Sequence, residues 1–205
     1  ASDVYKRQDY PHLDLSIQSH HSSELYGMLS EHNIDIGFVY HQLHYKNIIS
    51  EKLFEEKLYL LQSEHPVVEK PIVHTDELDS TKELFLSWDD NFQIWHDRWL
   101  SSVSRPHISA DTITLLDRLW KNADTWMIAP ESVIHELSRY RKVYVSELKN
   151  PAPNRICYKI KHKYPKTTSK RAVELFEEIL EQFLHLERKE ICLLYTSDAA
   201  DDTPC

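Results

Sequence analysis

The chain has 205 residues, of which 28% are charged, and its formal net charge is −9 at pH 7. An acidic chain without a basic stripe is a poor nucleic-acid binder, because duplex binding depends on lysine and arginine contacts to phosphates. No apolar run approaches the ~18 residues of a membrane span. The length fits one domain of two lobes, or two small domains.

Two terminal segments, Ala1–Gln8 (ASDVYKRQ) and Cys192–Cys205 (CLLYTSDAADDTPC), resemble translated sequencing-adaptor read-through. We expect residues 1–8 and 192–205 to be artefactual tails outside the fold; the alternative is a pair of ordinary disordered termini. Without them the chain loses four aspartates, one lysine and one arginine, which leaves a net charge of about −7, and Cys157 is the one remaining cysteine. One cysteine forms no disulfide framework, which favours a reducing compartment.

The first part of the remaining chain predicts a strand, a helix and a second strand. Residues 13–17 alternate apolar with polar side chains, as in a half-buried strand. Ser22 or Ser23 is a suitable N-cap for a short amphipathic helix. Residues 34–40 form a nearly continuous apolar run, typical of a strand covered on both faces. This order predicts a βαβ unit that presents free backbone N–H groups at its strand-to-helix junction, residues 20–23.

Residues 48–53 lead to a further strand, which is expected at 57–61, and Pro66 ends this region because proline cannot donate to a sheet ladder. A short apolar strand at 83–87 leads through a loop into a helix. The apolar stripe of that helix comprises Phe92, Trp95, Trp99 and Val103. Four large residues on one helix face more often form core than a cofactor site.

In the second half of the chain, Asp111 or Thr112 caps a helix. The predicted buried side of that helix comprises Leu115, Leu116, Leu119 and Trp120. Residues 126–129 read as a buried strand, and Pro130 lies in the first turn of the next helix. Strands at 142–145 and 155–160 precede the last helix. Strands that alternate with helices predict an α/β fold with a mostly parallel sheet in each half.

Four ordered blocks carry a family resemblance: YPHLDLSIQSHHSSELYGMLSEHNIDIGFVY (10–40), LFEEKLYLLQSEHP (53–66), WMIAPESVIHEL (126–137) and NPAPNRICYKI (150–160). Together they resemble the effector-binding domain of LysR-type transcriptional regulators. The resemblance implies a type II periplasmic-binding-protein-like fold, in which two α/β lobes joined by two crossing strands hold a ligand between them. It implies that lobe I comprises 9–73 plus 146–191 and lobe II comprises 74–145. The family's first strand and its DNA-binding winged helix-turn-helix would be missing.

The resemblance also implies where an effector is bound. Carried over by position, the family's effector contacts fall on His20, His21, Ser22, Ser23, Tyr40, Ser87, Trp88, Asp89, Asp111, Thr112, Ala129 and Pro130. Helix N-termini in this set suit a carboxylate, because unpaired N–H groups and the helix dipole favour an anion. The acidic residues Asp89, Asp90 and Asp111 favour a cationic or hydroxyl-rich ligand instead, and both alternatives stay open.

Several of these residues also have purely structural interpretations. Ser22 and Ser23 can act only as caps, Tyr40 can belong to the core or to an interface, and Trp88 can cover the hinge. A metal site could be built from His20, His21, His41 and His44. No Cys, Asp or Glu lies at ligand spacing from them, so we expect no metal and no cofactor.

The functional hypotheses follow from this pattern. The first is the effector-sensing domain of a cytoplasmic LysR-type regulator, which binds a small-molecule effector. The whole regulator would be a homodimer or homotetramer and would reach DNA only through the missing N-terminal domain. The alternative is an extracytoplasmic solute-binding protein of the same fold. An enzyme ranks last, because the sequence lacks the common catalytic and nucleotide-binding motifs GxSxG, GxxxxGK[ST], HExxH, CxxC and GxGxxG. A helix-turn-helix upstream would support the regulator, and a secretory signal would support the solute-binding protein. We expect no membrane partner.

Overall fold

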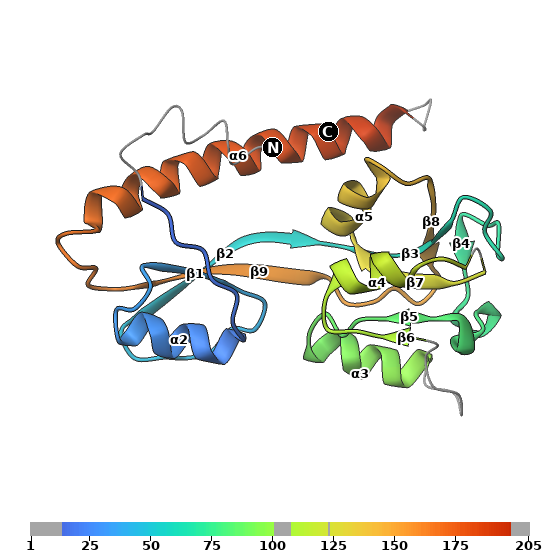
Figure 1. Cartoon of the computed structure of the whole chain (residues 1–205), viewed down its shortest axis with the longest axis horizontal. Helices are drawn as coiled ribbons and strands as arrows, with labels where there is room; N and C mark the ends of the chain where they lie inside the picture. The colour runs from blue at the N-terminus through green and yellow to red at the C-terminus, as the bar shows by residue number, and fades with distance from the viewer. Residues whose placement is uncertain (1–13, 101–107, 123, 198–205) are drawn as a thin grey trace. The chain divides into compact units, whose positions relative to one another are not determined.

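The computed structural model describes residues 14–100, 108–122 and 124–197. The chain divides into two compact units: unit 1 comprises 1–51 and 159–205, and unit 2 comprises 52–158. Two long strands, β2 (Ile48–Glu56) and β9 (Arg155–His162), each run from one unit into the other and are hydrogen-bonded neighbours (Figure 1). Both units contain helices and strands, so the predicted α/β class is confirmed.

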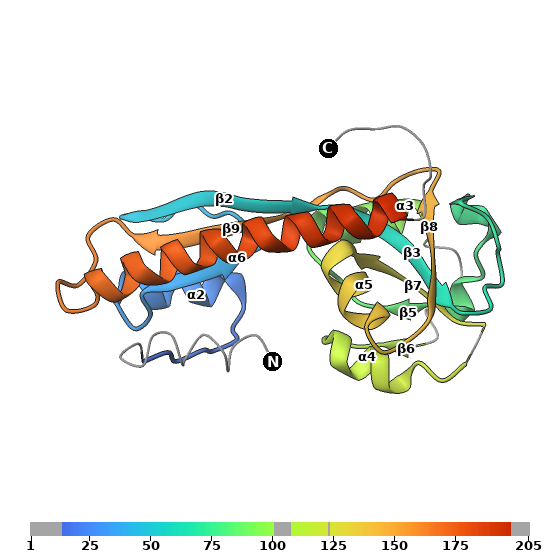
Figure 2. The same ribbon diagram turned by 90° about the horizontal axis from the view of Figure 1, so that it is seen from above.

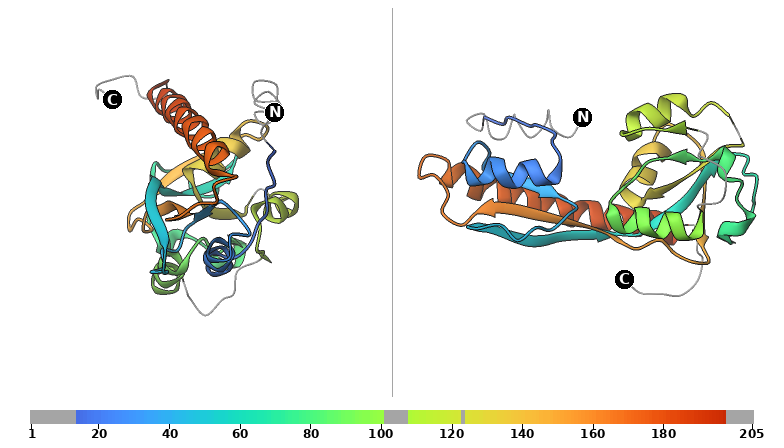
Figure 3. Two further views of the ribbon diagram at one scale, coloured as in Figure 1. Left: turned by 90° about the vertical axis from the view of Figure 1, so that its left-hand side faces the viewer. Right: turned by 90° about the horizontal axis from the view of Figure 1, so that it is seen from below.

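Unit 1 is built on a three-stranded sheet in the order β1-β9-β2, where β1 is Ile36–Val39. Helices α2 (Ser22–Ser30) and α6 (Lys170–Ser197) lie on opposite faces of this sheet (Figures 1 and 3). Burial alternates along β1, since Phe38 is 39% exposed although its ring contacts Phe176 of α6, whereas Val39 is buried. A helix lies on each face of the strand, as expected, but the expected burial on both faces is incomplete at Phe38.

Of the predicted strand at 13–17, residue 13 lies outside the described residues and residues 14–17 form no strand. Residues 14–20 are described in neither a helix nor a strand, and Ile17 is 84% exposed. Apolar alternation shows that one side of a segment could pack on a core, but a strand also needs a neighbour to take its backbone hydrogen bonds. The βαβ prediction is wrong for this reason, although the helix and β1 that follow are confirmed.

A partly buried ion-pair group holds α6 against the sheet of unit 1. Lys159 of β9, which is only 8% exposed, lies 3.1 Å from the Glu51 carboxylate and also pairs with Glu177 of α6. Lys161 lies 2.8 Å from the same Glu177 carboxylate. Burial would raise the pKa of Glu177, but the hydrogen bonds from both lysines outweigh it and hold that pKa below its usual value of 4.5. Burial would likewise lower the pKa of Lys159, and its two carboxylate partners raise it above 10.5.

We predict that Glu177→Gln lowers the free energy of unfolding by about 1–3 kcal/mol at neutral pH, because two ammonium groups lose their shared acceptor. A carboxylate with a depressed pKa stabilises the fold above its unfolded pKa, and that contribution disappears as the pH falls through the lower folded value. Urea unfolding measured from neutral pH to below 4.5 should therefore show a weaker loss of stability in Glu177→Gln than in the wild type. Glu178→Gln, an exposed neighbour on α6, is the matched control; a Glu177→Gln pH profile parallel to the wild type would contradict the assignment.

Unit 2 contains a four-stranded sheet in the order β4-β8-β3-β7. The central strand β3 (Leu58–Ser63) pairs antiparallel with both β7 (Trp126–Pro130) and β8 (Val143–Leu148). At the edge, β4 (Ile72–Val73) pairs parallel with β8. Helix α5 (Glu131–Ser138) connects β7 to β8, which are parallel to each other, and β3 is inserted between them in the opposite direction. The sheet is therefore mixed, and the prediction of a mostly parallel sheet is wrong here.

Both faces of this sheet carry a hydrophobic core. Leu58 and Leu60 of β3 pack in one cluster with Phe92 and Trp95, while Tyr59 and Leu61 pack in the other with helix residues such as Leu116 and Ile134. Successive side chains of a strand point to opposite faces. Five consecutive buried residues in β3 are thus explained by helices on both sides.

The pairing of β3 explains why the two units differ from the predicted lobes. The predicted lobe boundaries, after residues 73 and 145, both lie inside unit 2. Because β3 is hydrogen-bonded only to strands of unit 2 in the described part of the chain, residues 58–63 belong with that unit. Likewise, α6 continues past residue 191, where the C-terminal tail was expected to begin.

The smaller elements of unit 2 complete the layers (Figure 2). They are the 3₁₀ turns η1 (Thr75–Glu77) and η2 (Ser80–Lys82), strands β5 (Leu84–Phe85) and β6 (Ile108–Ser109), and helices α3 (Asp90–Trp99) and α4 (Ile113–Leu119). Phe92 and Trp95 are buried as predicted, whereas Trp99 is 40% exposed and Val103 lies outside the described residues. On α4, Leu116 is buried and Leu115 and Leu119 are exposed, so only half of that predicted stripe is correct.

Candidate functional site

Three parallel strands of unit 2 end at one edge. β5 and β6 pair parallel, and the Ala110 N–H donates to the Phe85 carbonyl at 3.1 Å just beyond the pair. β7 runs parallel to them, because Glu83 and Trp126 form a parallel bridge. The carboxyl ends of parallel strands are where α/β folds bind ligands. We call this region, with the loops that follow the three strands, the carboxyl edge.

The carboxyl edge brings together all the predicted site residues of unit 2. They are Ser87, Trp88 and Asp89 after β5, Asp111 and Thr112 after β6, and Ala129 and Pro130 at the end of β7. Direct contact links two of these groups, since the Trp88 indole Nε1 donates to the Ile128 carbonyl of β7 at 2.8 Å. Ser87 and Asp111 are exposed, whereas Ala129 and Pro130 are buried, so the side chains of these last two residues face the core.

Each helix that starts at the carboxyl edge already has a side-chain oxygen at its N-terminus. Asp89 accepts a hydrogen bond from the Phe92 N–H of α3 at 2.8 Å, and Thr112 accepts from the Leu115 N–H of α4 at 3.4 Å. Thr112, rather than Asp111, is thus the cap of α4. At α5 the oxygen comes from a distant residue, because the Glu56 carboxylate of β2 accepts from the Ser132 N–H at 3.1 Å. The positive ends of these helices are therefore already engaged by oxygens of the protein itself.

Glu56 and Arg155 were missed as parts of this region. Glu56 is 5% exposed, and one of its carboxylate oxygens lies 3.7 Å from the Arg155 guanidinium. That guanidinium is also 5.0 Å from the centre of the Trp88 ring, a cation–π distance. Arg155 therefore connects the Trp88 loop to the carboxylate at the start of α5. No local pattern singles out either residue, because Glu56 ends a strand that carries other charged residues and Arg155 begins another such strand.

The site residues predicted in unit 1 lie at the start of α2 and the end of β1. The N-cap of α2 is His21 and no side chain caps the helix, so the expectation that Ser22 or Ser23 is the cap is wrong. The His20 ring lies 3.3 Å from the Glu24 carboxylate. Tyr40 follows β1 directly, and the buried Tyr26 of α2 ties the next loop to the helix, because its hydroxyl donates to the His41 carbonyl at 3.4 Å. Sequence patterns gave no sign of this tyrosine anchor.

Comparison with known families decides the identity of this arrangement. The family model described as LysR substrate binding domain matches residues 6–184. The chain belongs to the LysR substrate-binding domain family. It is thus the effector-sensing domain of a LysR-type transcriptional regulator, and the alternative of a solute-binding protein is not favoured. Among curated proteins, no sequence matches the chain.

Solved structures support the same LysR-type fold. A mutant OxyR from Porphyromonas gingivalis superposes with a TM-score of 0.65 at 14% identity over 87% of this chain and 81% of that one. The regulatory domain of a mutant OxyR2 from Vibrio vulnificus gives 0.65 at 15% identity over 89% and 88%. The reduced OxyR regulatory domain from Pseudomonas aeruginosa gives 0.62 at 16% identity over 82% and 80%. The predicted type II periplasmic-binding-protein-like fold is therefore confirmed.

The LysR family is a family of regulatory domains rather than typical enzymes. Within the described residues, no group of three or more His, Cys, Asp or Glu side chains is placed to hold a metal ion. Cys157 lies buried in β9. In the same part of the chain, no helix combines the length and the apolar character needed to cross a bilayer.

Proposed function

We propose that the predicted residues at the carboxyl edge of unit 2 bind the small-molecule effector of this LysR domain, and that unit 1, taken by itself, offers the predicted residues at the start of α2 and the end of β1 as effector contacts. The observation that supports this is the convergence of Ser87–Asp89, Asp111–Thr112 and Pro130 at the ends of three parallel strands. Effector binding would shift the balance between two states of the parent protein, since a ligand shifts an equilibrium only by its differential affinity. The parent would act in the cytoplasm as a homodimer or homotetramer, reach DNA through its own N-terminal domain and catalyse no reaction.

The chemistry of the carboxyl edge favours an effector with a cationic or hydroxyl-rich group. The helix N-termini that could have attracted a carboxylate are engaged by Asp89, Thr112 and Glu56. Asp90 and Asp111 are exposed at the same edge. A carboxylate ligand would meet like charges there, whereas an amine or a polyol would find acceptors. At this edge we therefore propose the second of the two alternatives left open by the sequence, a cationic or hydroxyl-rich ligand.

We predict that amines, amino acids and polyols raise the melting temperature of the chain more than simple carboxylates do, in a thermal-shift panel run at one ionic strength. For the best ligand, Asp89→Asn should weaken binding about fivefold, because a partly exposed charge contact contributes about 1 kcal/mol. Asparagine is as good an N-cap as aspartate, so the stability of α3 should be retained. Asp111→Asn should weaken binding similarly without affecting any cap.

Asp76→Asn is the matched control, because Asp76 is an exposed aspartate of η1 in the same unit, away from the carboxyl edge. An equal loss of affinity in Asp89→Asn, Asp111→Asn and Asp76→Asn would show that the ligand responds only to net charge. That result would contradict the proposed site. Stronger stabilisation by carboxylates than by amines and polyols would refute the proposed ligand class while leaving the family assignment intact.

A further inference from the structure

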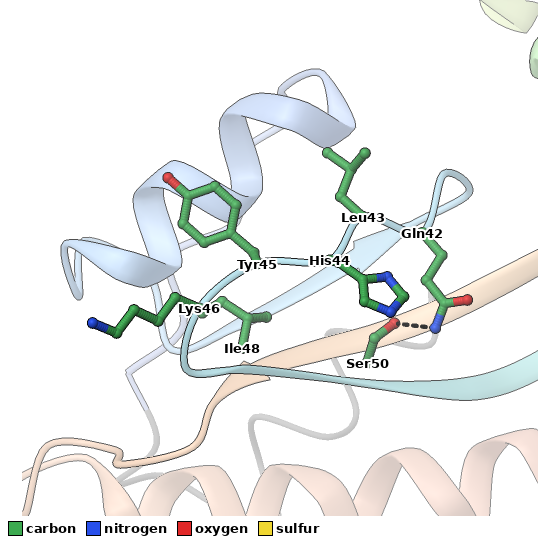
Figure 4. A pocket seen from close by; sticks show the side chains of 7 residues that line it. All are labelled: Gln42, Leu43, His44, Tyr45, Lys46, Ile48 and Ser50. Atoms are coloured by element: carbon green, nitrogen blue, oxygen red, sulfur yellow. Dashed lines mark hydrogen bonds between the residues drawn. The ribbon is translucent and has the colours of Figure 1, made fainter.

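The loop between β1 and β2 surrounds a hollow of about 400 Å³ in unit 1, a size typical of small-ligand sites. Its lining consists of Gln42, Leu43, His44, Tyr45, Lys46, Ile48 and Ser50 (Figure 4). None of the residues proposed to bind the effector is among them. The hollow is thus a second place on the domain where a small molecule could bind.

The loop around this hollow is held in place by hydrogen bonds. The fully buried Tyr26 hydroxyl accepts from the Leu43 N–H at 2.9 Å and donates to the His41 carbonyl. Asn47 adopts a left-handed backbone conformation with φ of 62°, which asparagine tolerates better than most residues. Its carbonyl accepts from the Lys163 N–H of the segment after β9 at 2.7 Å. A hollow with such a framework is preformed, so a ligand need not order the loop when it binds.

The side chains divide the hollow into two parts (Figure 4). His44, Gln42 and Ser50 gather on one side, where the Gln42 amide donates to the Ser50 hydroxyl at 3.4 Å. Leu43 and Tyr45 point toward α2, and Lys46 extends at the far end of the loop. Amide, imidazole and hydroxyl groups supply hydrogen-bond donors, and the lysine supplies a positive charge.

Two sequence segments that meet beside the hollow lack carboxylates although the chain as a whole is acidic, and Glu51, which follows the lining residue Ser50, is paired with Lys159. Residues 36–50 contain no aspartate or glutamate, and neither do residues 148–173, while the whole chain carries −9. The hydrogen bond from Lys163 to Asn47 joins these two segments. Across the described ranges of the chain, Lys46 and Lys163 form no ion pair with a carboxylate. The loop therefore combines hydrogen-bond donors with positive charge that no described carboxylate neutralises.

We propose that this hollow is an accessory site for a small oxyanion, either a carboxylate or a phosphate group. An anion on the polar side of the hollow gains donors from Gln42, His44 and Ser50, and the Lys46 charge at the far end of the loop attracts it from a distance. Because most of the lining is exposed to water, which weakens charge contacts, the dissociation constant should be on the order of 1–10 mM. The site is independent of the carboxyl edge, so it can exist whether or not the effector proposal is correct.

The test is an NMR titration of the ¹⁵N-labelled full chain with sodium phosphate and, separately, sodium acetate, with chloride keeping the ionic strength constant. We expect saturable shifts of the 42–50 amide signals for at least one probe. Saturation by phosphate alone would assign the site to phosphate groups, and saturation by acetate alone would assign it to carboxylates. Lys46→Gln and His44→Leu should each weaken binding by about threefold or more, a loss of about 0.7 kcal/mol.

Lys121→Gln is the matched control, because Lys121 is an exposed lysine of unit 2 and its loss changes the net charge equally. Its affinity for the probe should equal that of the wild type. The proposal would be overturned if neither probe saturates by ~50 mM. It would also be overturned if Lys46→Gln and His44→Leu, folded by circular dichroism, bind as tightly as the wild type.

Discussion

Replacing His96 with alanine is expected to lower the free energy of unfolding by about 3–5 kcal/mol, because it leaves a buried carboxylate without its partner. The His96 Nε2 atom lies 2.8 Å from one Glu83 carboxylate oxygen and 3.0 Å from the other. Glu83 is 1% exposed and His96 is 6% exposed. The rings of Phe85 and Phe92 lie against the imidazole ring at tilted angles and help to keep water away from the pair. Urea unfolding followed by circular dichroism measures the change.

Two further variants separate the pair from the volume of the side chain. His65→Ala, at an exposed position, should stay within about 0.5 kcal/mol of the wild type. The double variant Glu83→Met with His96→Phe removes both polar groups, and it should recover much of the stability lost in His96→Ala. A loss below about 1 kcal/mol in His96→Ala would mean that Glu83 finds another donor or water.

Truncating Leu60 to alanine is expected to cost about 2–5 kcal/mol, the range for a fully buried leucine whose removal leaves a cavity. Leu60 is 0% exposed and lies in the middle of β3, between its two antiparallel neighbours. Leu119→Ala, at a leucine of α4 that is 47% exposed, should cost far less. Chemical denaturation of both variants checks the prediction. Similar losses in the two would show that the sheet of unit 2 is not the rigid centre of the fold.

Much of the α/β order could be predicted because each helix and most strands carry their own local pattern. The segment at 13–17 shows where this method fails. Its alternation is as regular as that of a real strand, but a ladder needs a partner that local pattern does not supply. The same limit explains β3, whose two neighbours are more than 60 residues away in sequence, so its antiparallel pairing could not be read from nearby residues.

The candidate residues that directly follow a strand could be selected from the sequence. Ser87–Asp89 and Asp111–Thr112 follow strands, and resemblance to the family is enough to select them. Glu56 and Arg155 escaped because their importance comes from a contact between segments about 100 residues apart. The proposed ligand class depends on a similar contact, since only the folded chain shows that the Glu56 carboxylate accepts a hydrogen bond at the start of α5.

The insertion of β3 between β7 and β8 also affects how the chain emerges from the ribosome. β3 pairs with residues of β7 that lie 64 to 72 positions later, as in Gln62 with Trp126 and Leu58 with Pro130. At about 5–20 residues per second, synthesis of the intervening chain takes roughly 3–14 s. During that time β3, which has five consecutive buried residues in the folded chain, has neither neighbour, and an unpaired strand is a template for aggregation. Slower translation should therefore lengthen the period in which the nascent chain depends on chaperones.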